Sequence, residues 1–445
     1  MDQDFCGRVI VPGSPGYTLA RQEYNRAIQK FPAFIAYCTD EESVVKAVHA
    51  ACKSGLPARV RSGGHNYEGF SVGNRAAVID VGCMNDLTLN ETAGTLTAGP
   101  GVLNRELYEA AGAHGYPFPS GTCPTVAVAG LTQGGGWGLS ARMFGLTCDS
   151  LISATLIDAH GRRHRADAHH DEELFFALRG GGGGNFGVVT SLTYQLPPKL
   201  FDVTYVELEA LQVSEKTAAE FILCFQRWLL QGDKRFTPIA RVTHTPEENR
   251  GLILRGIYYG NEAQARASMA PFLSLGLSGV FAEMTFLQAV RIVEDTYPPY
   301  ERFSDGGRFA LLPFTKGEAL HIVSLINALA PGSVRGAISL YGLGGTVSEV
   351  LPRETAFFYR GALNIVSLST VWEDPTAKRA NLDWFAPRFH MLQELTRGSY
   401  VNFPTLENRA YMRAYYGGNA NELRCVKTRI DPDNLFRFPQ SIPPG

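Results

Sequence analysis

The sequence lacks the features that mark membrane-spanning and nucleic-acid-binding proteins. No apolar run approaches the roughly 18 residues that a membrane span requires. The 41 Lys and Arg residues are balanced by 43 Asp and Glu residues, which gives a net charge of -2. Because a nucleic-acid-binding face needs a basic excess, we expect neither a membrane partner nor a nucleic-acid partner.

The N-terminus also lacks the pattern of a signal peptide. Its first residues, MDQDFCGRVIVPG, contain neither a basic segment nor the apolar segment that would follow it. This favours a cytoplasmic location, and secretion stays open because a removed leader would leave the same sequence.

No closely spaced cysteines or histidines indicate a metal site. The eight cysteines form no CxxC pair and stand at positions 6, 38, 52, 83, 123, 148, 224 and 425. In a chain of this length we interpret them as mostly buried free thiols of a reducing compartment. His169 and His170 lie in an expected surface turn and, being adjacent, face apart, so no metal ligand set is predicted.

Glycine is what the sequence has in excess. The 47 glycines amount to about one residue in ten, against an average near 7%. One cluster contains Gly182-x-Gly184-x-x-Gly187, but a helix is expected before it and a strand after it, the reverse of a dinucleotide fingerprint. The segment GLTQGGGWG (130–138) lacks the Lys-Ser/Thr of a phosphate-binding P-loop. A Rossmann-type NAD site and a nucleoside-triphosphate site are therefore both rejected.

Four glycine segments each stand beside the end of an expected strand. They are residues 62–64, 99–101, 130–138 and 180–187. Exposed backbone N–H groups hold phosphate oxygens, and missing side chains leave room for flat rings. The alternative is close packing of helices on a sheet. Four such segments together favour a ligand that contains a pyrophosphate and large rings.

The length of 445 residues predicts two domains. Up to Pro197, short strands alternate with helices, such as an amphipathic helix over 40–55 that Asp40 caps. Residues 200–395 hold few glycine clusters and combine amphipathic helices with strand-like runs, as expected of a second α+β domain. We place the domains at 1–197 and 198–396, with a C-terminal segment, 397–445, that returns to the first.

Five segments, in this order, resemble the berberine-bridge-enzyme-like oxidases of the vanillyl-alcohol-oxidase group of FAD enzymes. They are RVRSGGHNYEG, TAGPGV, PSGTCPTVAVAGLTQGGGWGLSARMFGLTCD, ALRGGGGGNFGVV and YYGGNANELRCVKTRIDPDNLFRFPQSI. The resemblance spans nearly the whole chain and is least specific in its middle. It implies a two-domain α+β fold, with a PCMH-type FAD-binding domain and a substrate domain built on an antiparallel sheet covered by helices.

The resemblance also implies how FAD is held. In this family the histidine of R-S-G-G-H is bonded to the 8α-methyl of the flavin and the cysteine of G-T-C-P-T to its C6, which gives His65 and Cys123 here. The remaining cofactor-binding residues that it implies are Arg61, Ser62, Gly63, Gly64 and Tyr67 at the pyrophosphate, Gly121, Thr122, Thr125 and Val126 around the flavin ring, Gly130, Gly135 and Asp149 along the rest of the cofactor, Val189 at the adenine side through its backbone, and Asn434 beside the flavin.

The reaction implied is oxidation of an alcohol by hydride transfer to flavin N5, after which O2 is reduced to H2O2. Tyr400, in the segment GSYVNFP, matches the family's proton-abstracting tyrosine, and Phe403 takes the place of the second aromatic. Tyr341 is the candidate for an assisting phenol, with a structural strand aromatic as its alternative. Val126, three residues after Cys123, favours an oxidase because a larger residue there closes the oxygen pocket in relatives.

Other functions stay open at this stage. They are an FAD-dependent dehydrogenase that passes electrons to a carrier, an oxidative ring-closing enzyme acting on an alkaloid-like or polyketide substrate, and a flavoprotein that binds without turnover. The sequence predicts a small-molecule substrate, O2 and a monomer or small homo-oligomer. It does not separate sugar, polyketide and alkaloid substrates.

Overall fold

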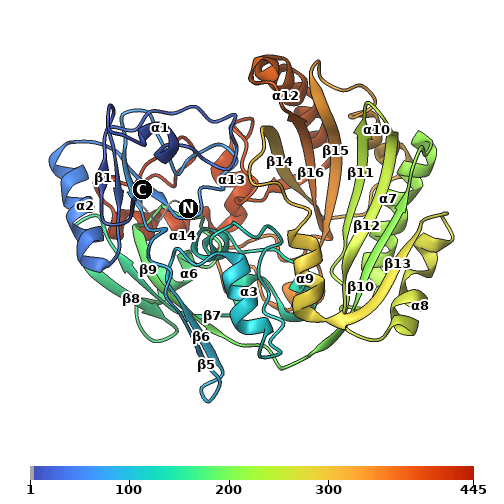
Figure 1. Cartoon of the computed structure of the whole chain (residues 1–445), viewed down its shortest axis with the longest axis horizontal. Helices are drawn as coiled ribbons and strands as arrows, with labels where there is room; N and C mark the ends of the chain where they lie inside the picture. The colour runs from blue at the N-terminus through green and yellow to red at the C-terminus, as the bar shows by residue number, and fades with distance from the viewer. Residues whose placement is uncertain (1–4) are drawn as a thin grey trace.

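The computed structural model describes residues 5–445, which form three β-sheets and the helices packed on them (Figure 1). The first sheet is formed near the N-terminus, with a parallel core of three strands and one antiparallel edge strand. Its order is β1 (Val9–Ile10), β2 (Phe34–Tyr37), β4 (Ala77–Asp80) and β3 (Ala58–Arg61).

The second sheet is antiparallel and brings together segments about a hundred residues apart. The strand before the segment 99–101 pairs with the strand after the glycine cluster 180–187. Its order is β5 (Leu87–Asn90), β6 (Thr95–Ala98), β9 (Val188–Gln195), β7 (Leu151–Ile157) and β8 (Arg163–Asp167).

The third sheet is large and antiparallel throughout. Its order is β13 (Ser278–Thr285), β10 (Asp202–Ala210), β12 (Asn249–Tyr258), β11 (Ile239–Thr245), β15 (Ser333–Gly342), β16 (Asn364–Trp372), β14 (Phe303–Ala310) and β17 (Arg397–Ser399). The expected α+β class, with an antiparallel sheet in the second half, is confirmed.

Helices cover one face of the large sheet and leave the other toward the N-terminal half (Figure 1). The covering helices are α7 (Glu215–Gln231), α8 (Glu262–Leu273), α10 (Lys316–Ser324) and α12 (Lys378–Leu395). Phe221, Phe272 and Phe389 of these helices join Leu254 and Leu340 of the strands in one buried core. Since alternate residues of a strand point to opposite faces, the residues between these apolar ones face the N-terminal half.

The other α-helices are shorter or lie nearer the N-terminal half. They are α1 (Tyr17–Ala20), α2 (Glu41–Lys53), α3 (Asn104–Gly112), α4 (Val128–Gln133), α5 (Ala141–Phe144), α6 (Glu172–Ala177), α9 (Phe286–Glu294), α11 (Thr346–Glu349), α13 (Tyr411–Tyr416) and α14 (Ala420–Ile430). Helix α2 confirms the expected helix over 40–55, because Asp40 accepts a hydrogen bond from Ser43 N and Val44, Ala47, Val48 and Ala51 are buried. Among the described residues, none of the helices combines the length and apolar character needed to cross a membrane.

The C-terminal segment packs onto the first sheet. The Ala58 N–H of β3 donates to the Leu435 carbonyl. The buried Lys427 of α14 donates to Asp431 and to the carbonyls of Asn185 and Phe436, which fixes this segment against the loop before β9. The strand β17, by contrast, pairs with β14 of the large sheet. The domain boundaries at 197 and 396 stay predictions.

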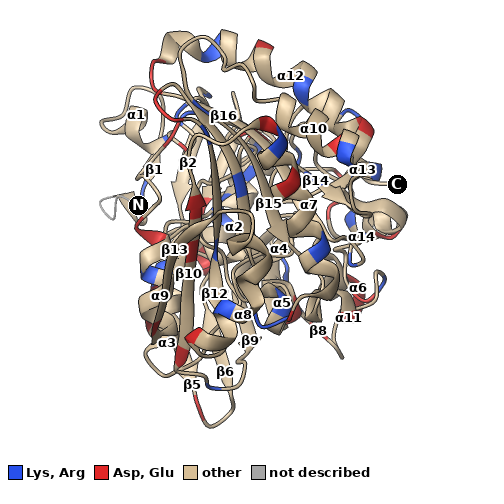
Figure 2. Cartoon of the chain, turned by 90° about the vertical axis from the view of Figure 1, so that its right-hand side faces the viewer, with Lys and Arg blue, Asp and Glu red and all other residues tan. Residues whose placement is uncertain are grey.

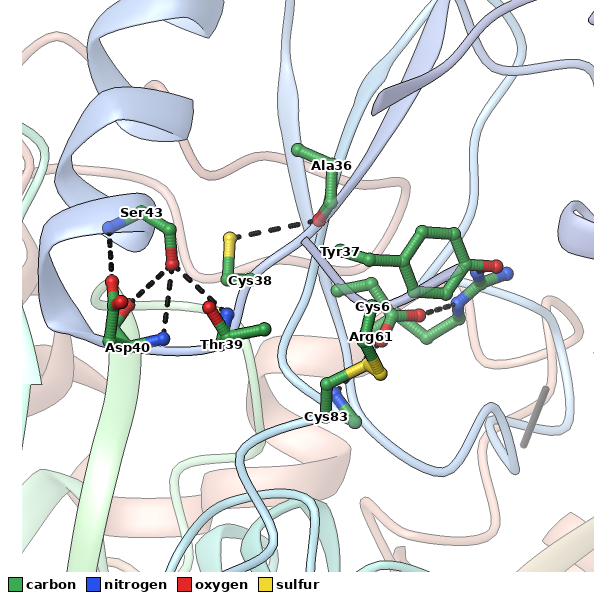
Figure 3. Close-up of a disulfide and its surroundings, with 11 residues drawn as sticks. Cys6, Ala36, Tyr37, Cys38, Thr39, Asp40, Ser43, Arg61 and Cys83 are labelled. Carbon is green, nitrogen blue, oxygen red and sulfur yellow. Dashed lines mark hydrogen bonds and ion pairs between the residues drawn. A yellow bond between two sulfur atoms is a disulfide. The ribbon is translucent and has the colours of Figure 1, made fainter. Parts of the chain in front are cut away.

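Charged residues are interspersed along the helices and strands (Figure 2), as the net charge of -2 suggests. The cysteines differ from expectation. Cys6 and Cys83 form a disulfide (Figure 3), and Cys52 and Cys425 are exposed. The expectation of mostly buried free thiols is therefore wrong for these four residues. The cysteines consequently no longer argue for a reducing compartment. Sequence spacing concealed the pair because 77 residues separate the two cysteines.

The disulfide predicts a measurable contribution to stability. Replacing both cysteines, as Cys6→Ala with Cys83→Ala, reopens a loop of 77 residues in the unfolded chain. Closing a loop of this size typically stabilises a protein by about 2 to 4 kcal/mol. We expect the free energy of unfolding from urea titration under non-reducing conditions to fall by this amount. An unchanged transition midpoint and slope would contradict the prediction.

Candidate active site

A large cavity lies between the glycine loops of the N-terminal half and the uncovered face of the large sheet. One wall comes from residues 62–67, 121–123, 126–127, 129–131 and 182–185, and the opposite wall comes from the strands β11, β12, β14, β15 and β16. Three of the four glycine segments predicted to hold a ligand thus reach one cavity, together with Pro100 of the fourth.

Unpaired backbone donors follow β3 at the cavity wall. Within the described part of the chain, the N–H groups of Ser62, Gly63, Gly64 and His65 donate to no acceptor. Successive free N–H groups of this kind form a concave site for an anion. They fit the pyrophosphate of FAD without a lysine.

Two glycines keep space open on the same wall. A Cβ atom added to Gly130 of α4 would meet no atom within 4 Å, and one added to Gly183 would meet the Gly130 Cα at 3.6 Å. Both residues line the cavity, so side chains at these positions would project into it. The residues present therefore fit a ligand that approaches the backbone closely, as FAD would.

His65 is held in a neutral form with one ring nitrogen engaged. Its Nε2 lies 2.9 Å from Thr125 Oγ1, and its ring stacks on Tyr24 with centroids 4.2 Å apart. Desolvation by the surrounding protein lowers the pKa of His65 to about 3. Since Thr125 contacts Nε2, Nδ1 is the nitrogen left for a ligand, and the imidazole ring as a whole is uncharged at neutral pH.

Cys123 lies beside the same threonine. Its Sγ is 3.7 Å from Thr125 Oγ1, and its carbonyl accepts a hydrogen bond of 2.9 Å from Asn104 Nδ2. Burial raises the pKa of the Cys123 thiol, although hydrogen bonds from Thr125 lower it. The structure thus brings His65 and Cys123, 58 positions apart in the sequence, to one stretch of cavity wall on either side of Thr125.

The other predicted cofactor residues divide into two groups. Those that line the cavity are Ser62, Gly63, Gly64, Tyr67, Gly121, Thr122, Val126, Gly130 and Val189. Those set back from it are Arg61, which pairs with Asp80 and Glu23; Thr125, whose hydroxyl contacts His65 and Cys123; Asp149, which pairs with Arg360; Gly135, which packs against Phe357; and Asn434, in the turn after Asp431. The ion pairs of Arg61 and Asp149 lie behind the cavity wall. These two residues therefore support the wall and do not line the cavity.

Tyr400 is also set back from the cavity. Its hydroxyl oxygen accepts hydrogen bonds from the backbone N–H groups of Gly136 and Trp137, each at 3.1 Å, and from Asn402 Nδ2 at 3.2 Å. The residue is 1% exposed, and burial raises its pKa to about 12. The hydroxyl therefore holds the turn after α4, and Phe403 of the same segment reaches the cavity.

Tyr341, by contrast, faces the cavity from β15. Its ring packs against Trp137 and Phe403, with centroids 4.9 Å and 5.2 Å apart. Burial raises the pKa of the Tyr341 phenol, and the charge of Arg241 opposes that rise. The phenol is consequently neutral near pH 7 and is suited to donating a hydrogen bond.

Sequence reasoning missed Asp305, a carboxylate on the cavity wall that the large sheet forms. It lies on β14, lines the cavity and accepts a hydrogen bond of 2.6 Å from Ser367 Oγ of the neighbouring strand β16. Burial raises the pKa of Asp305 to about 7, against the lowering effects of that hydrogen bond and of Arg241. An acidic residue inside a strand, in FSDGGRFA, was the available signal.

Comparison with known proteins agrees with this geometry. The family model described as an FAD binding domain matches residues 32–167, and the model described as berberine and berberine like matches residues 399–443. Fold and site together define an FAD-linked oxidoreductase. The chain belongs to the berberine-bridge-enzyme-like family, which confirms the resemblance inferred from the sequence.

Three relatives illustrate the range of similarity. The uncharacterized FAD-linked oxidoreductase YgaK of Bacillus subtilis is 33% identical, over 98% of this chain and 97% of that protein. Berberine bridge enzyme-like 12 of Arabidopsis thaliana is 30% identical, over 94% of this chain and 86% of that protein. The solved structure of a chitooligosaccharide oxidase superposes with a TM-score of 0.88 at 25% identity, covering 98% of this chain and 97% of that one.

Proposed function

We propose that this protein is an alcohol oxidase whose FAD is bound covalently by His65 and Cys123. The observation that carries the proposal is the position of these two side chains on one cavity wall, with the His65 ring uncharged and its Nδ1 without a hydrogen-bond partner among the described residues. When bound, the flavin would accept a hydride from the alcohol carbon, and O2 would take up the two electrons and two protons as H2O2.

We propose Asp305 as the group that accepts the hydroxyl proton of the substrate. A general base acts best when its pKa lies near the working pH, and the pKa of Asp305 is about 7. Tyr400 was the candidate from the sequence, but its hydroxyl oxygen is engaged by three N–H donors behind the wall. Tyr341 keeps an assisting role, since its neutral phenol can donate a hydrogen bond to the substrate oxygen.

Replacing Tyr400 separates a supporting role from a catalytic one. In Tyr400→Phe the buried N–H groups of Gly136 and Trp137 lose their acceptor. An unsatisfied buried donor costs about 1 to 3 kcal/mol, so we expect the free energy of unfolding to fall by that order. Once the flavin is bound, we expect the pH dependence of its anaerobic reduction to match that of the unmodified protein. Loss of that pH dependence with unchanged stability would return the base role to Tyr400.

Val126 sets the expected reactivity with oxygen. It lines the cavity three residues after Cys123, and a leucine there would add a methylene group to the cavity wall. We expect Val126→Leu to slow flavin reoxidation by O2 about tenfold or more, which corresponds to about 1.4 kcal/mol of barrier. Anaerobic reduction should be unchanged. Val280→Leu, at an exposed position of β13, is the control, and equal reoxidation in all three proteins would show that oxygen enters elsewhere.

A substrate screen tests the proposed activity. Under anaerobic conditions, aldoses, oligosaccharides, benzylic alcohols and amines are added in turn, and loss of the yellow flavin absorbance identifies a reductant. Air is then admitted, and H2O2 formed in equal amount to product supports the oxidase. Reduction by amines alone would contradict the alcohol specificity, and reoxidation only by an added electron carrier would indicate a dehydrogenase.

A further inference from the structure

We propose that the substrate carries a carboxylate group and that Arg241 binds it. This inference rests on the proposed function, because it names the class of alcohol that the cavity accepts. It is carried by the arrangement of charged side chains on the uncovered face of the large sheet, opposite the wall that holds His65 and Cys123.

Three arginines lie on this wall, one on each of three neighbouring strands. Arg255 is on β12, Arg241 on β11 and Arg335 on β15, and all three line the cavity. The strand register places Arg241 opposite Ser339 and between Ile253 and Ser339. Because side chains alternate along a strand, these residues share the face that the outer helices do not cover.

Two of the three arginines are neutralised by the protein. Arg255 pairs with Glu207 at 2.8 Å, and Arg335 pairs with Glu301 at 3.1 Å. Arg241 donates from Nε to Ser339 Oγ at 3.0 Å. Among residues 5–445 no carboxylate lies within ion-pair distance of Arg241. Its two terminal nitrogens are left for a ligand.

A second observation points the same way. The Nε atom of Arg335 is buried and has no hydrogen-bond partner in the described chain. A buried donor without an acceptor is costly, and Arg335 stands on the strand that also carries Ser339, the partner of Arg241. Arg335 thus keeps one buried N–H without an acceptor, and Arg241 is the guanidinium that this wall leaves open to the cavity.

The charge balance favours a carboxylate over a phosphate monoester. Of the described residues on this wall, Arg241 is the one guanidinium without an ion pair, since Arg335 already balances Glu301, and Asp305 lines the same wall. A phosphate monoester carries about −1.5 to −2 charges near pH 7, which exceeds the single charge of Arg241 and would leave a negative excess beside Asp305. A carboxylate carries one charge and matches the planar guanidinium with two parallel hydrogen bonds.

The experiment compares two probes of the same shape, benzoate and benzamide, by calorimetric titration of the holoenzyme. We expect the unmodified protein to bind benzoate about tenfold or more tightly than benzamide, since a charge-assisted contact is about twice as strong as a neutral one. Arg241→Gln should bring the two affinities within about twofold, a difference of roughly 0.4 kcal/mol. Arg266→Gln, which breaks an exposed pair with Glu262 on α8, should keep the preference.

Three results would overturn the proposal: equal affinities for benzoate and benzamide in the unmodified protein, no benzoate binding, or an undiminished preference in Arg241→Gln. If Arg241→Gln does not fold, Ser339→Ala replaces it, because loss of the Ser339 hydroxyl releases Arg241 Nε and should reduce the preference several-fold.

Oxidation of 4-(hydroxymethyl)benzoate and its amide separates the two proposals. Equal kcat/KM for both would retain the alcohol oxidase and reject the carboxylate site. Absence of oxidation of these two compounds and of every alcohol in the substrate screen, with the benzoate preference intact, would retain the site and reject the proposed activity.

Discussion

Replacing Asp305 by asparagine is expected to slow flavin reduction by an alcohol about 10²- to 10⁴-fold, the usual contribution of a general base. The substitution keeps the size of the side chain and removes the proton acceptor. In the unmodified protein the rate should rise with pH and level off above about 7, because the carboxylate form acts as the base and the pKa of Asp305 is about 7. In Asp305→Asn this rise should be absent. Stopped-flow reduction at several pH values provides the measurement.

One control variant and one stability measurement accompany this prediction. Asp295→Asn changes an exposed carboxylate that faces Arg105 outside the cavity, and should leave the rate and its pH profile intact.

Folding raises the pKa of Asp305 above its ordinary value. The protonated Asp305 carboxyl therefore contributes to the free energy of unfolding at low pH, and this contribution is lost as pH rises through about 7. Asp305→Asn should therefore flatten the decline in stability over that range. A mutant as fast as the unmodified protein at every pH would exclude Asp305 as the base.

The second large effect concerns retention of the flavin. His65→Ala and Cys123→Ala should each keep yellow protein after acid precipitation, because one covalent bond remains in each. The double variant should release all of its flavin to the supernatant. Absorbance of pellet and supernatant gives the result, and Cys148→Ala, which alters a buried thiol away from the cavity, is the matched control. Release of all flavin from either single variant would show that only the residue replaced there forms a bond.

The cofactor side of the site could be predicted from the sequence because its chemistry depends on local backbone. Gly63, just after β3, leaves a free N–H group, and Gly130 in helix α4 leaves open space, and both effects arise from the local backbone. The helix α2 was predictable for the same reason, since its cap and apolar stripe lie within one segment. His65 and Cys123 needed the resemblance, because nothing in the spacing shows that Thr125 lies between them.

The substrate side could not be predicted, because it depends on strand register. Arg241 and Asp305 share a wall only because β11 pairs with β15, β15 with β16 and β16 with β14, and no local pattern fixes that order. The same limit applies to Tyr400. Its motif located the segment correctly, but the direction of its side chain follows from the contact with Gly136 and Trp137, more than 260 positions away.

Peptide mass spectrometry of the unmodified protein tests the central claim most directly. The protein is digested without releasing bound flavin, and the masses of the peptides that contain His65 and Cys123 are determined. The account predicts a cross-linked species in which both peptides carry the same FAD. Unmodified His65 and Cys123 peptides, with all FAD recovered free, would contradict it.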